Sequence, residues 1–370
     1  MNSDPGLASW LQLALTPGLG AATLQRMLRQ FGLPQAALAR KRAELGAFTT
    51  PAVLAALDSE AVAHAVEQAL AWASQPGHAV ITLADDTYPR LLLEISDPPA
   101  LLYARGRTEL LSRTALAIVG SRNATQQGEA NAEALAKALS NAGLTIVSGL
   151  ALGIDAAAHR GGLAGAGSTI AVLGTGIDVV YPSRNAALAA EIAERGVLIS
   201  EFPLGAAPAA QNFPRRNRLI SGLAQGCLVV EAALASGSLI TARAAAEQGR
   251  EVFAIPGSIH SPLAKGCHAL IKSGAKLVES AEDVLAELSG FRPSGYASTT
   301  ASTAKAPPAA ADAGLLAYMG HDPVDVDSLC ARAGMSAEQV SSELLRLELD
   351  GRVAALPGGL YQRLEKGQRR

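Results

Sequence analysis

Short apolar runs alternate with helical stretches through the middle of the chain. The run Ala115–Val119 is entirely apolar, and Gln126–Asn141 after it is predicted to be helical. The same alternation predicts strands at Leu144–Val147, Thr169–Leu173, Val197–Ile199, Leu228–Val230 and Val252–Ile255, and helices at Ile154–Leu163, Ala186–Arg195 and Leu239–Gln248. Short apolar strands separated by helices form parallel sheets that are covered on both faces. We therefore expect an α/β domain with a doubly wound, mostly parallel sheet.

The first 75 residues are predicted to be helical instead. Apolar residues recur at three- and four-residue spacing, as in Leu24, Met27 and Phe31, and the turn Gly18–Gly20 precedes them. A glycine turn between helices is typical of SAM-like and helix-hairpin-helix modules, whose backbone amides can grip a phosphate. Such turns are also common as plain connections between helices. We expect residues 1–75 to form a helical module of this kind, and contact with DNA by this module stays open.

The end of the chain has a different composition. Residues 291–310 are rich in Pro, Ser, Thr and Ala, which is typical of a linker. The pattern beyond predicts helices at Leu315–Met319, Val326–Ala333 and Ala337–Leu349, and a hairpin of Arg352–Leu356 with Leu360–Leu364. This arrangement predicts a winged helix over residues 311–370, which leaves 79–290 to the α/β domain. The third helix is acidic, with Arg346 as its one basic residue, so it favours a partner-contact or regulatory role over reading DNA.

Charge and cysteine content limit the classes of function. The formal net charge is −2, so any nucleic-acid binding must come from a local patch. Residues 211–276 supply one, with eight Lys or Arg against three Asp or Glu. The three cysteines lack CxxC spacing and suit a reduced, cytoplasmic protein. We expect no signal peptide, no membrane span and no metal site, since Cys267, His268 and His260 lack a second cluster.

Glycine-containing loops follow the predicted strands. They are Gly120-Ser121-Arg122, Ser148-Gly149-Leu150 with Gly153-Ile154-Asp155, Gly174-Thr175-Gly176 and Ser236-Gly237-Ser238. Glycine lets the backbone approach a phosphate closely, and Arg122 adds a fork of donors. Because parallel sheets bind ligands beyond the carboxyl ends of their strands, these loops predict one shared anion site.

The segment 213–257 contains the parts of a site for a phosphate chain with exposed bases. Three arginines, Arg215, Arg216 and Arg218, lie beside Phe213, and Ser236–Ser238 precedes a helical stretch. Arginine supplies charge, phenylalanine can stack on a base, and a helix N-terminus attracts an anion. The simpler alternative is a basic surface loop followed by an ordinary β-α unit.

Other chemistries have weaker support. The G-x-G-x-x-G and Walker A motifs are absent from the sequence, so we expect no nicotinamide cofactor, no ATPase activity and no cofactor at all. Asp155 and His159 share a predicted helix face and could form an acid–base pair, or they could hold their loop in place. Glu201 and Glu231 each follow a strand and could act as bases or accept hydrogen bonds from amides or arginines.

Seven segments, in order along the chain, resemble the DNA-processing protein A family (DprA, also called Smf). They are GSRNAT at 120–125, SGLALGIDAAAHRGGL at 148–163, IAVLGTGIDVVYPSRN at 170–185, SEFPLG at 200–205, NFPRRNRLISGL at 212–223, VVEAALASGSLITARAAAEQGREVFAIPG at 229–257 and GCHALIKSGA at 266–275. The resemblance implies an extended Rossmann-like fold that binds single-stranded DNA without enzymatic turnover. It also implies a recombination mediator that protects incoming DNA and assists RecA loading in natural transformation. Self-association is implied too, through a surface that contains Ile271 and Leu277.

The same motifs imply the residues of the DNA site. These are Gly120, Ser121, Arg122, Ser183, Arg184, Asn212, Phe213, Arg215, Asn217, Arg218, Ser236, Gly237, Ser238 and Thr241. One position departs from the family pattern, because many relatives carry a lysine just before the Phe motif where this chain has Ala210–Asn212. The affinity for DNA is therefore expected to depend more on the arginines.

Two rival functions stay open at this point. Similar doubly wound folds include phosphoribohydrolases with a PGGxGT-type loop, and Ser236–Thr241 takes a comparable place without the Pro-Gly-Gly. A nucleotide sensor whose winged helix regulates transcription is the other rival.

Overall fold

The computed structural model describes residues 5–288, 314–319 and 323–364. These residues fall into two compact units, one with residues 5–124 and 128–288, the other with 125–127, 314–319 and 323–364. The predicted linker at 291–310 lies outside the described residues. Within the described part of the chain, no helix combines the length and apolar character that crossing a bilayer requires.

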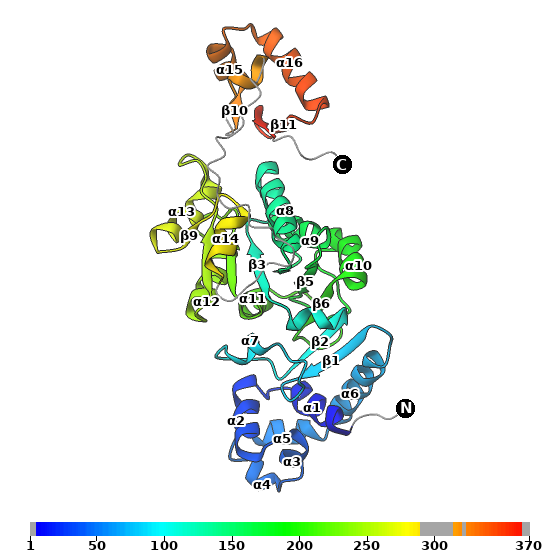
Figure 1. Ribbon diagram of the computed structural model, residues 1–370. Coiled ribbons are helices and arrows are strands. Elements are labelled where there is room, and N and C mark those ends of the chain that lie inside the picture. Colours follow the sequence, from blue (N-terminus) through cyan, green and yellow to red (C-terminus); the bar gives the residue numbers. More distant parts are fainter. Residues whose placement is uncertain (1–4, 289–313, 320–322, 365–370) are drawn as a thin grey trace. The chain divides into compact units, whose positions relative to one another are not determined.

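A nine-stranded sheet forms the centre of the larger unit (Figure 1). Its strands are β1 (His78–Thr82), β2 (Leu101–Gly106), β3 (Ala115–Val119), β4 (Thr145–Ser148), β5 (Thr169–Val172), β6 (Val197–Ser200), β7 (Gly226–Val229), β8 (Glu251–Ala254) and β9 (Lys276–Leu277). They are ordered β1-β2-β6-β5-β4-β3-β7-β8-β9. All neighbours from β6 to β9 pair in parallel, which confirms the predicted sheet, whereas β2 pairs antiparallel with both β1 and β6.

Helices cover both faces of this sheet because its strands are apolar on both faces. In β3, Ala117 and Val119 pack against α11 (Asn212–Gly222), α12 (Gly237–Glu247) and α13 (Lys265–Lys272). Leu116 and Ile118 pack on the other side, against α8 (Gln126–Asn141), α9 (Ile154–Leu163) and α14 (Ala281–Glu287). Helix α10 (Ala186–Arg195) joins the covering of β5 and β6. The fold is therefore doubly wound, with β3 at the point where the winding reverses.

Six helices precede the sheet and form the helical module. They are α1 (Pro5–Leu15), α2 (Ala21–Phe31), α3 (Pro34–Leu38), α4 (Arg42–Leu45), α5 (Pro51–Leu57) and α6 (Glu60–Ala73). The module has its own core, which includes Leu13, Leu24 and Met27. Leu11 of α1 and Trp72 of α6 belong instead to a cluster that includes strand residues, so the module packs against the sheet.

The smaller unit contains the winged helix. Helices α15 (Val326–Ala333) and α16 (Ala337–Leu349) pack against the hairpin of β11 (Val353–Leu356) and β12 (Leu360–Arg363). Two details differ from the sequence prediction. The expected helix at Leu315–Met319 is one 3₁₀ turn, Gly314–Ala317, and a short strand β10 (Val324–Asp325) pairs with β12. Val324 is buried where β10 pairs with β12, so tertiary pairing decides the structure of this segment.

Candidate nucleic-acid-binding site

The loops after β3 and β7 meet at the reversal point of the sheet. The Ser121 N–H donates to the carbonyl of Glu231 (2.7 Å), and the Ile154 N–H donates to the carbonyl of Ser121 (3.2 Å). A Cβ atom on Gly120 would lie 2.6 Å from Ile154 Cγ1 and 2.9 Å from the Glu231 carbonyl, so only glycine fits there. A crevice at such a reversal point is where doubly wound sheets bind ligands.

A cleft of about 710 Å³ opens at this point. It is within the size range of ligand sites in proteins. Nine of the residues expected from sequence line it: Gly120, Ser121, Arg122, Phe213, Asn217, Ser236, Gly237, Ser238 and Thr241. Residues far apart in the sequence are thus brought to one cleft by the sheet.

Phe213 forms an aromatic wall of this cleft. Its half-buried ring lies 5.3 Å from the guanidinium carbon of Arg122 and 5.7 Å from the ring of Tyr181. A Cβ on Gly174 would lie 3.0 Å from the Phe213 ring. The absence of a side chain at Gly174 therefore allows the ring to pack against the loop after β5. A cation above an aromatic face is the combination that stacks bases and neutralises phosphates.

The N-terminus of α12 also lines the cleft. Ser236 is its N-cap and accepts a hydrogen bond from the Ser238 N–H (3.3 Å). The Asn217 side chain donates to the Gly237 carbonyl (3.4 Å), which ties α11 to this helix start. A Cβ on Gly237 would meet no heavy atom within 4 Å, so the surface is open here. The helix dipole favours an anion at this end.

Arg216 lies in the floor of the cleft and is buried, unlike Arg215. Its guanidinium donates to the carbonyls of Gly149 and Val172, at the carboxyl ends of β4 and β5. Burial lowers the pKa of Arg216 to about 10, although the nearby Asp155 raises it. Arg216 therefore has a structural role, because its guanidinium is hydrogen-bonded to the carboxyl ends of two strands.

Asp155 and His159 hold the loop after β4. The Asp155 carboxylate accepts the N–H groups of Gly149 (3.1 Å) and Ala151 (3.4 Å). Burial raises the pKa of Asp155, and Arg216 opposes this. His159 Nε2 accepts the Leu150 N–H (3.2 Å), and burial, with Arg216 and Arg160, lowers the pKa of His159 to about 3. The two side chains thus have separate loop contacts, which favours the loop-holding alternative over an acid–base pair.

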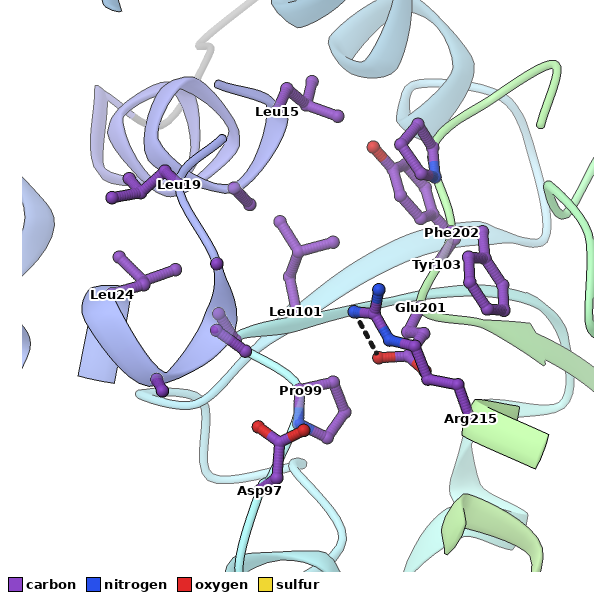
Figure 2. A pocket seen from close by; sticks show the side chains of 16 residues that line it. Leu15, Leu19, Leu24, Asp97, Pro99, Leu101, Tyr103, Glu201, Phe202 and Arg215 are labelled. Atoms are coloured by element: carbon purple, nitrogen blue, oxygen red, sulfur yellow. Dashed lines mark hydrogen bonds and ion pairs between the residues drawn. The ribbon is translucent and has the colours of Figure 1, made fainter. Parts of the chain in front are cut away.

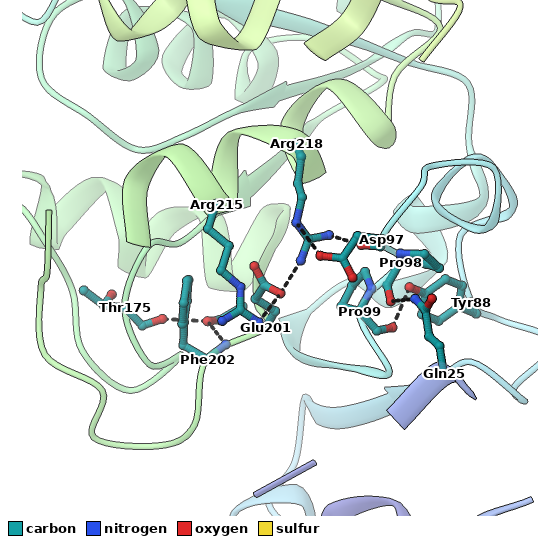
Figure 3. Close-up of polar contacts among 11 residues, drawn as sticks. Gln25, Tyr88, Asp97, Pro98, Pro99, Thr175, Glu201, Phe202, Arg215 and Arg218 are labelled. Carbon is teal, nitrogen blue, oxygen red and sulfur yellow. Dashed lines mark hydrogen bonds and ion pairs between the residues drawn. The ribbon is translucent and has the colours of Figure 1, made fainter. Parts of the chain in front are cut away.

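Arg215 and Arg218 lie on another side of α11, where both form ion pairs with Glu201 (Figure 3). The Glu201 side chain is 2% exposed, and its Oε2 accepts hydrogen bonds from Arg218 and, at 3.1 Å, from Arg215. Arg218 is 16% exposed and also donates to the Asp97 carbonyl, whereas Arg215 is 52% exposed. Neither arginine lines the cleft. Burial raises the pKa of Glu201, and Arg218 and Arg215 lower it.

The remaining expected residues lie outside the cleft lining. Ser183 and Arg184 are exposed on a 3₁₀ turn, Ser183–Asn185, and Asn212 begins α11. Leu277 is 47% exposed on the edge strand β9, and Ile271 lies partly buried on α13. The sequence reasoning did not single out Tyr181, whose ring is 46% exposed beside Phe213. Its aromatic character next to Ser183 and Arg184 is the signal that could have found it.

Comparison with known proteins yields consistent matches. The family model described as DNA recombination-mediator protein A matches residues 79–289, and the model of the DprA winged helix domain matches 299–359. Protein Smf of Escherichia coli (strain K12) is 46% identical over 305 residues, which cover 81% of each chain. The DNA processing protein DprA of Streptococcus pneumoniae (strain ATCC BAA-255 / R6) is 50% identical over 206 residues, 56% of this chain and 73% of that protein.

Two solved structures are also similar. DNA processing protein A from Streptococcus pneumoniae superposes with a TM-score of 0.69 at 39% identity and covers 77% of this chain and 99% of that one. DNA processing protein A from Helicobacter pylori, described for its single-stranded DNA binding mode, gives a TM-score of 0.52 at 31% identity over 56% and 94%. Because the family model covers more than half of the chain and Smf covers four fifths of it, the chain belongs to the DNA recombination-mediator protein A (DprA/Smf) family.

Proposed function

We propose that this protein binds single-stranded DNA in the cleft at the reversal point of the sheet and acts as a recombination mediator. The observation that carries the proposal is the meeting of Arg122, Phe213 and the α12 N-terminus around one cleft. A single strand offers phosphates to the cations and amides, and it offers unpaired base faces to the ring. A duplex stacks its bases inside and would leave Phe213 without a partner.

The relatives support this ligand. The Helicobacter pylori protein has a described single-stranded DNA binding mode, and the chain shares its family with it. By the same reasoning we propose the other residues expected from sequence as contacts outside the cleft: Ser183, Arg184, Asn212, Arg215 and Arg218. Arg184 and Arg215 are exposed and can reach the backbone of a strand that leaves the cleft.

We also propose that the protein works without catalytic turnover. Asp155 lines the cleft and His159 lies one helical turn further along α9, and both are buried with backbone N–H groups as partners. A general base needs access to the proton that it removes. A site without such chemistry fits a protein that protects DNA and passes it on.

The wider role is part of the same proposal. We propose that the protein loads RecA onto bound strands in the cytoplasm and that it self-associates through the edge strand β9 and α13. Leu277 supports the second point, since an exposed leucine on an edge strand is an open position for pairing. The proposed domains are the helical module (1–75), the DNA-binding domain (79–290) and the winged helix (311–370), joined by a linker (291–310).

Titration of labelled single and double strands at several salt concentrations tests the proposal. Phosphate contacts release counterions, so single-strand affinity should fall steeply with salt, and the duplex should bind more weakly. The variant Arg122→Ala should bind all sequences more weakly and lower the slope of log affinity against log salt by about one. Arg113→Ala is the matched control, because Arg113 is an exposed arginine at the opposite end of β3. Equal affinities for single and double strands, or nucleotide hydrolysis, would reject the proposal.

A further inference from the structure

The aromatic surface at the DNA cleft continues beyond Phe213 to Tyr181. The centres of the two rings lie 5.7 Å apart, and their planes are tilted by 42°. Tyr181 is 46% exposed, and Tyr318 is the one other exposed aromatic residue in the described part of the chain. Aromatic rings contribute most where a core or an interface covers them, so an exposed ring beside a ligand cleft points to a surface that the ligand covers.

Tyr181 is held in place although it is exposed. Val180 before it packs into the apolar cluster that α10 shares with β5 and β6. Asn185 after it is 8% exposed and donates hydrogen bonds to the carbonyls of Leu150 (2.9 Å) and Ala151 (3.1 Å) in the loop after β4. The backbone is therefore anchored on both sides of Tyr181, and a base that covers the ring meets a surface that is already formed.

Phe213 is close to a cation and to the second ring. The Arg122 guanidinium carbon lies 5.3 Å from the centre of the Phe213 ring, and the centre of the Tyr181 ring lies 5.7 Å from it. The two ring centres are further apart than the rise of about 3.4 Å between stacked bases of a helical strand. An unstacked, extended strand can therefore place one base on each ring. Arg184, exposed on the 3₁₀ turn that follows, offers a cation to a phosphate of the same part of the strand.

Two other aromatic rings near α11 are covered instead. Tyr103 and Phe202 line a pocket between the helical module and the sheet (Figure 2), and they are 1% and 5% exposed. The guanidinium carbon of Arg215 lies 5.4 Å from the centre of the Phe202 ring, and Arg215 pairs with Glu201 (3.1 Å). These rings are therefore not open to a base, whereas the ring of Tyr181 is.

We propose that Tyr181 stacks the base next to the one on Phe213, so that two rings hold two neighbouring bases of the strand. The proposal rests on the proposed function, because it extends the strand bound in the cleft by one nucleotide. Every base has a flat face, so stacking on Tyr181 adds affinity for a single strand without reading its sequence. A duplex keeps its bases stacked on one another and gains nothing from this ring.

Anisotropy titrations with a labelled oligothymidylate test the second ring. Tyr181→Ala should weaken binding by about tenfold, within the range for one stacked base, and Tyr181→Phe should keep the wild-type affinity because it keeps the ring. Tyr318→Ala is the matched control, since Tyr318 is 47% exposed and lies in the smaller unit. Melting temperatures check that each variant is folded. Wild-type affinity in Tyr181→Ala, or a loss in Tyr181→Phe as large as in Tyr181→Ala, would overturn the proposal.

A double variant distinguishes a stacking ring from one that only supports Phe213. If Tyr181 holds a base of its own, adding Tyr181→Ala to Phe213→Ala should weaken binding by about tenfold again. If Tyr181 only supports the Phe213 ring, the added substitution has no effect, and the proposal falls. A wild type that does not bind oligothymidylate rejects the proposed function as well, whereas loss of the Tyr181 effect alone rejects only the second ring.

Fluorescence of an introduced indole reports on the stacked base directly. The two native tryptophans, Trp10 and Trp72, are 6% and 9% exposed, so a change on addition of DNA comes from the new side chain. Oligothymidylate should quench the emission of Tyr181→Trp and leave that of Tyr318→Trp unchanged. An indole at position 181 that is not quenched while anisotropy shows bound DNA would contradict the proposal.

Discussion

The three arginines of α11 point in different directions from the helix and therefore differ in their partners or their exposure. Arg216 points into the floor and donates to strand carbonyls, whereas Arg218 pairs with the buried Glu201. Arg215 remains half exposed. Three neighbouring cations in the sequence therefore have three different environments, because each residue of a helix is turned about 100° from the last.

Arg218→Ala should destabilise the fold more than it weakens DNA binding. The substitution leaves a buried carboxylate with one partner, Arg215, and breaking a buried ion pair costs roughly 3 kcal/mol. Urea denaturation measures the free energy of unfolding, and Arg122→Ala is the control, with an expected change within about 0.5 kcal/mol. An Arg218→Ala variant as stable as the wild type would contradict this expectation, and a loss of DNA affinity without a loss of stability would make contact with DNA the main role of Arg218.

Phe213→Ala should lower single-strand affinity by roughly 1–3 kcal/mol, because a stacked base is lost. Fluorescence anisotropy with a labelled oligothymidylate measures this loss. Phe48→Ala is a matched control, since Phe48 is also half buried with an arginine, Arg26, 6.0 Å above its ring. A large drop in melting temperature with intact affinity would make Phe213 a core residue.

At the scale of elements, the loop between β4 and α9 depends on a neutral histidine. Thr169 Oγ1 donates to the Ile146 carbonyl, so it accepts from His159 Nδ1–H, and the network assigns the proton to that nitrogen. Nε2 is then free to accept the Leu150 N–H. Protonation of Nε2 would break this bond in a buried place, which agrees with the pKa of about 3.

This histidine should make the protein less stable in mild acid. The pKa of His159 is about 3 in the folded protein and about 6.5 in the unfolded chain. As the pH falls, His159 is therefore protonated in the unfolded chain before it is protonated in the folded protein. The contribution of neutral His159 to the free energy of unfolding is complete above about pH 6.5, and it decreases as the pH falls towards 3. From pH 7 to pH 5 the loss is about 2 kcal/mol by this linkage.

Urea denaturation at both pH values checks this expectation. His159→Gln should lose about 2 kcal/mol less than the wild type between pH 7 and pH 5. His64→Gln, at an exposed histidine of α6, should follow the wild type. Equal losses in all three proteins would mean that His159 does not set the acid sensitivity.

The buried strands and the glycine loops can be predicted from sequence, whereas the path of α11 cannot. Strands such as β3 are apolar at every position, which leaves few alternatives to a two-sided core. Asn212–Arg218 is mostly polar and has Pro214 in its first turn, so its sequence does not indicate a buried helix. Its position depends on the hydrogen bonds from Arg216 to carbonyl groups at the ends of β4 and β5, which are distant in the sequence. The antiparallel strands β1 and β2 are missed for a similar reason, since their pairing is set by tertiary contacts.

At the scale of the whole molecule, the smaller unit should contribute little to single-strand affinity. Helix α16 carries Glu338, Glu343 and Glu348, and its Arg346 pairs with Glu343 (2.5 Å) and Asp350 (3.7 Å). Phosphates are repelled by such a surface. The predicted cleft lies wholly within the larger unit.

Truncation after residue 290 should therefore reduce single-strand affinity by less than about tenfold, below roughly 1.4 kcal/mol. Anisotropy titrations of the full chain and the truncated chain give the comparison, and circular dichroism checks that the larger unit stays folded. If a folded truncated protein no longer binds, the winged helix is a principal contact with DNA.

The central claim is that single-stranded DNA occupies the cleft formed by the loops after β3 and β7 with α11 and α12. A structure of the protein with a short oligothymidylate tests it most directly. We expect a base stacked on Phe213 and phosphates beside Arg122 and the N-terminus of α12. A strand bound elsewhere on the molecule, with this cleft empty, would contradict the account.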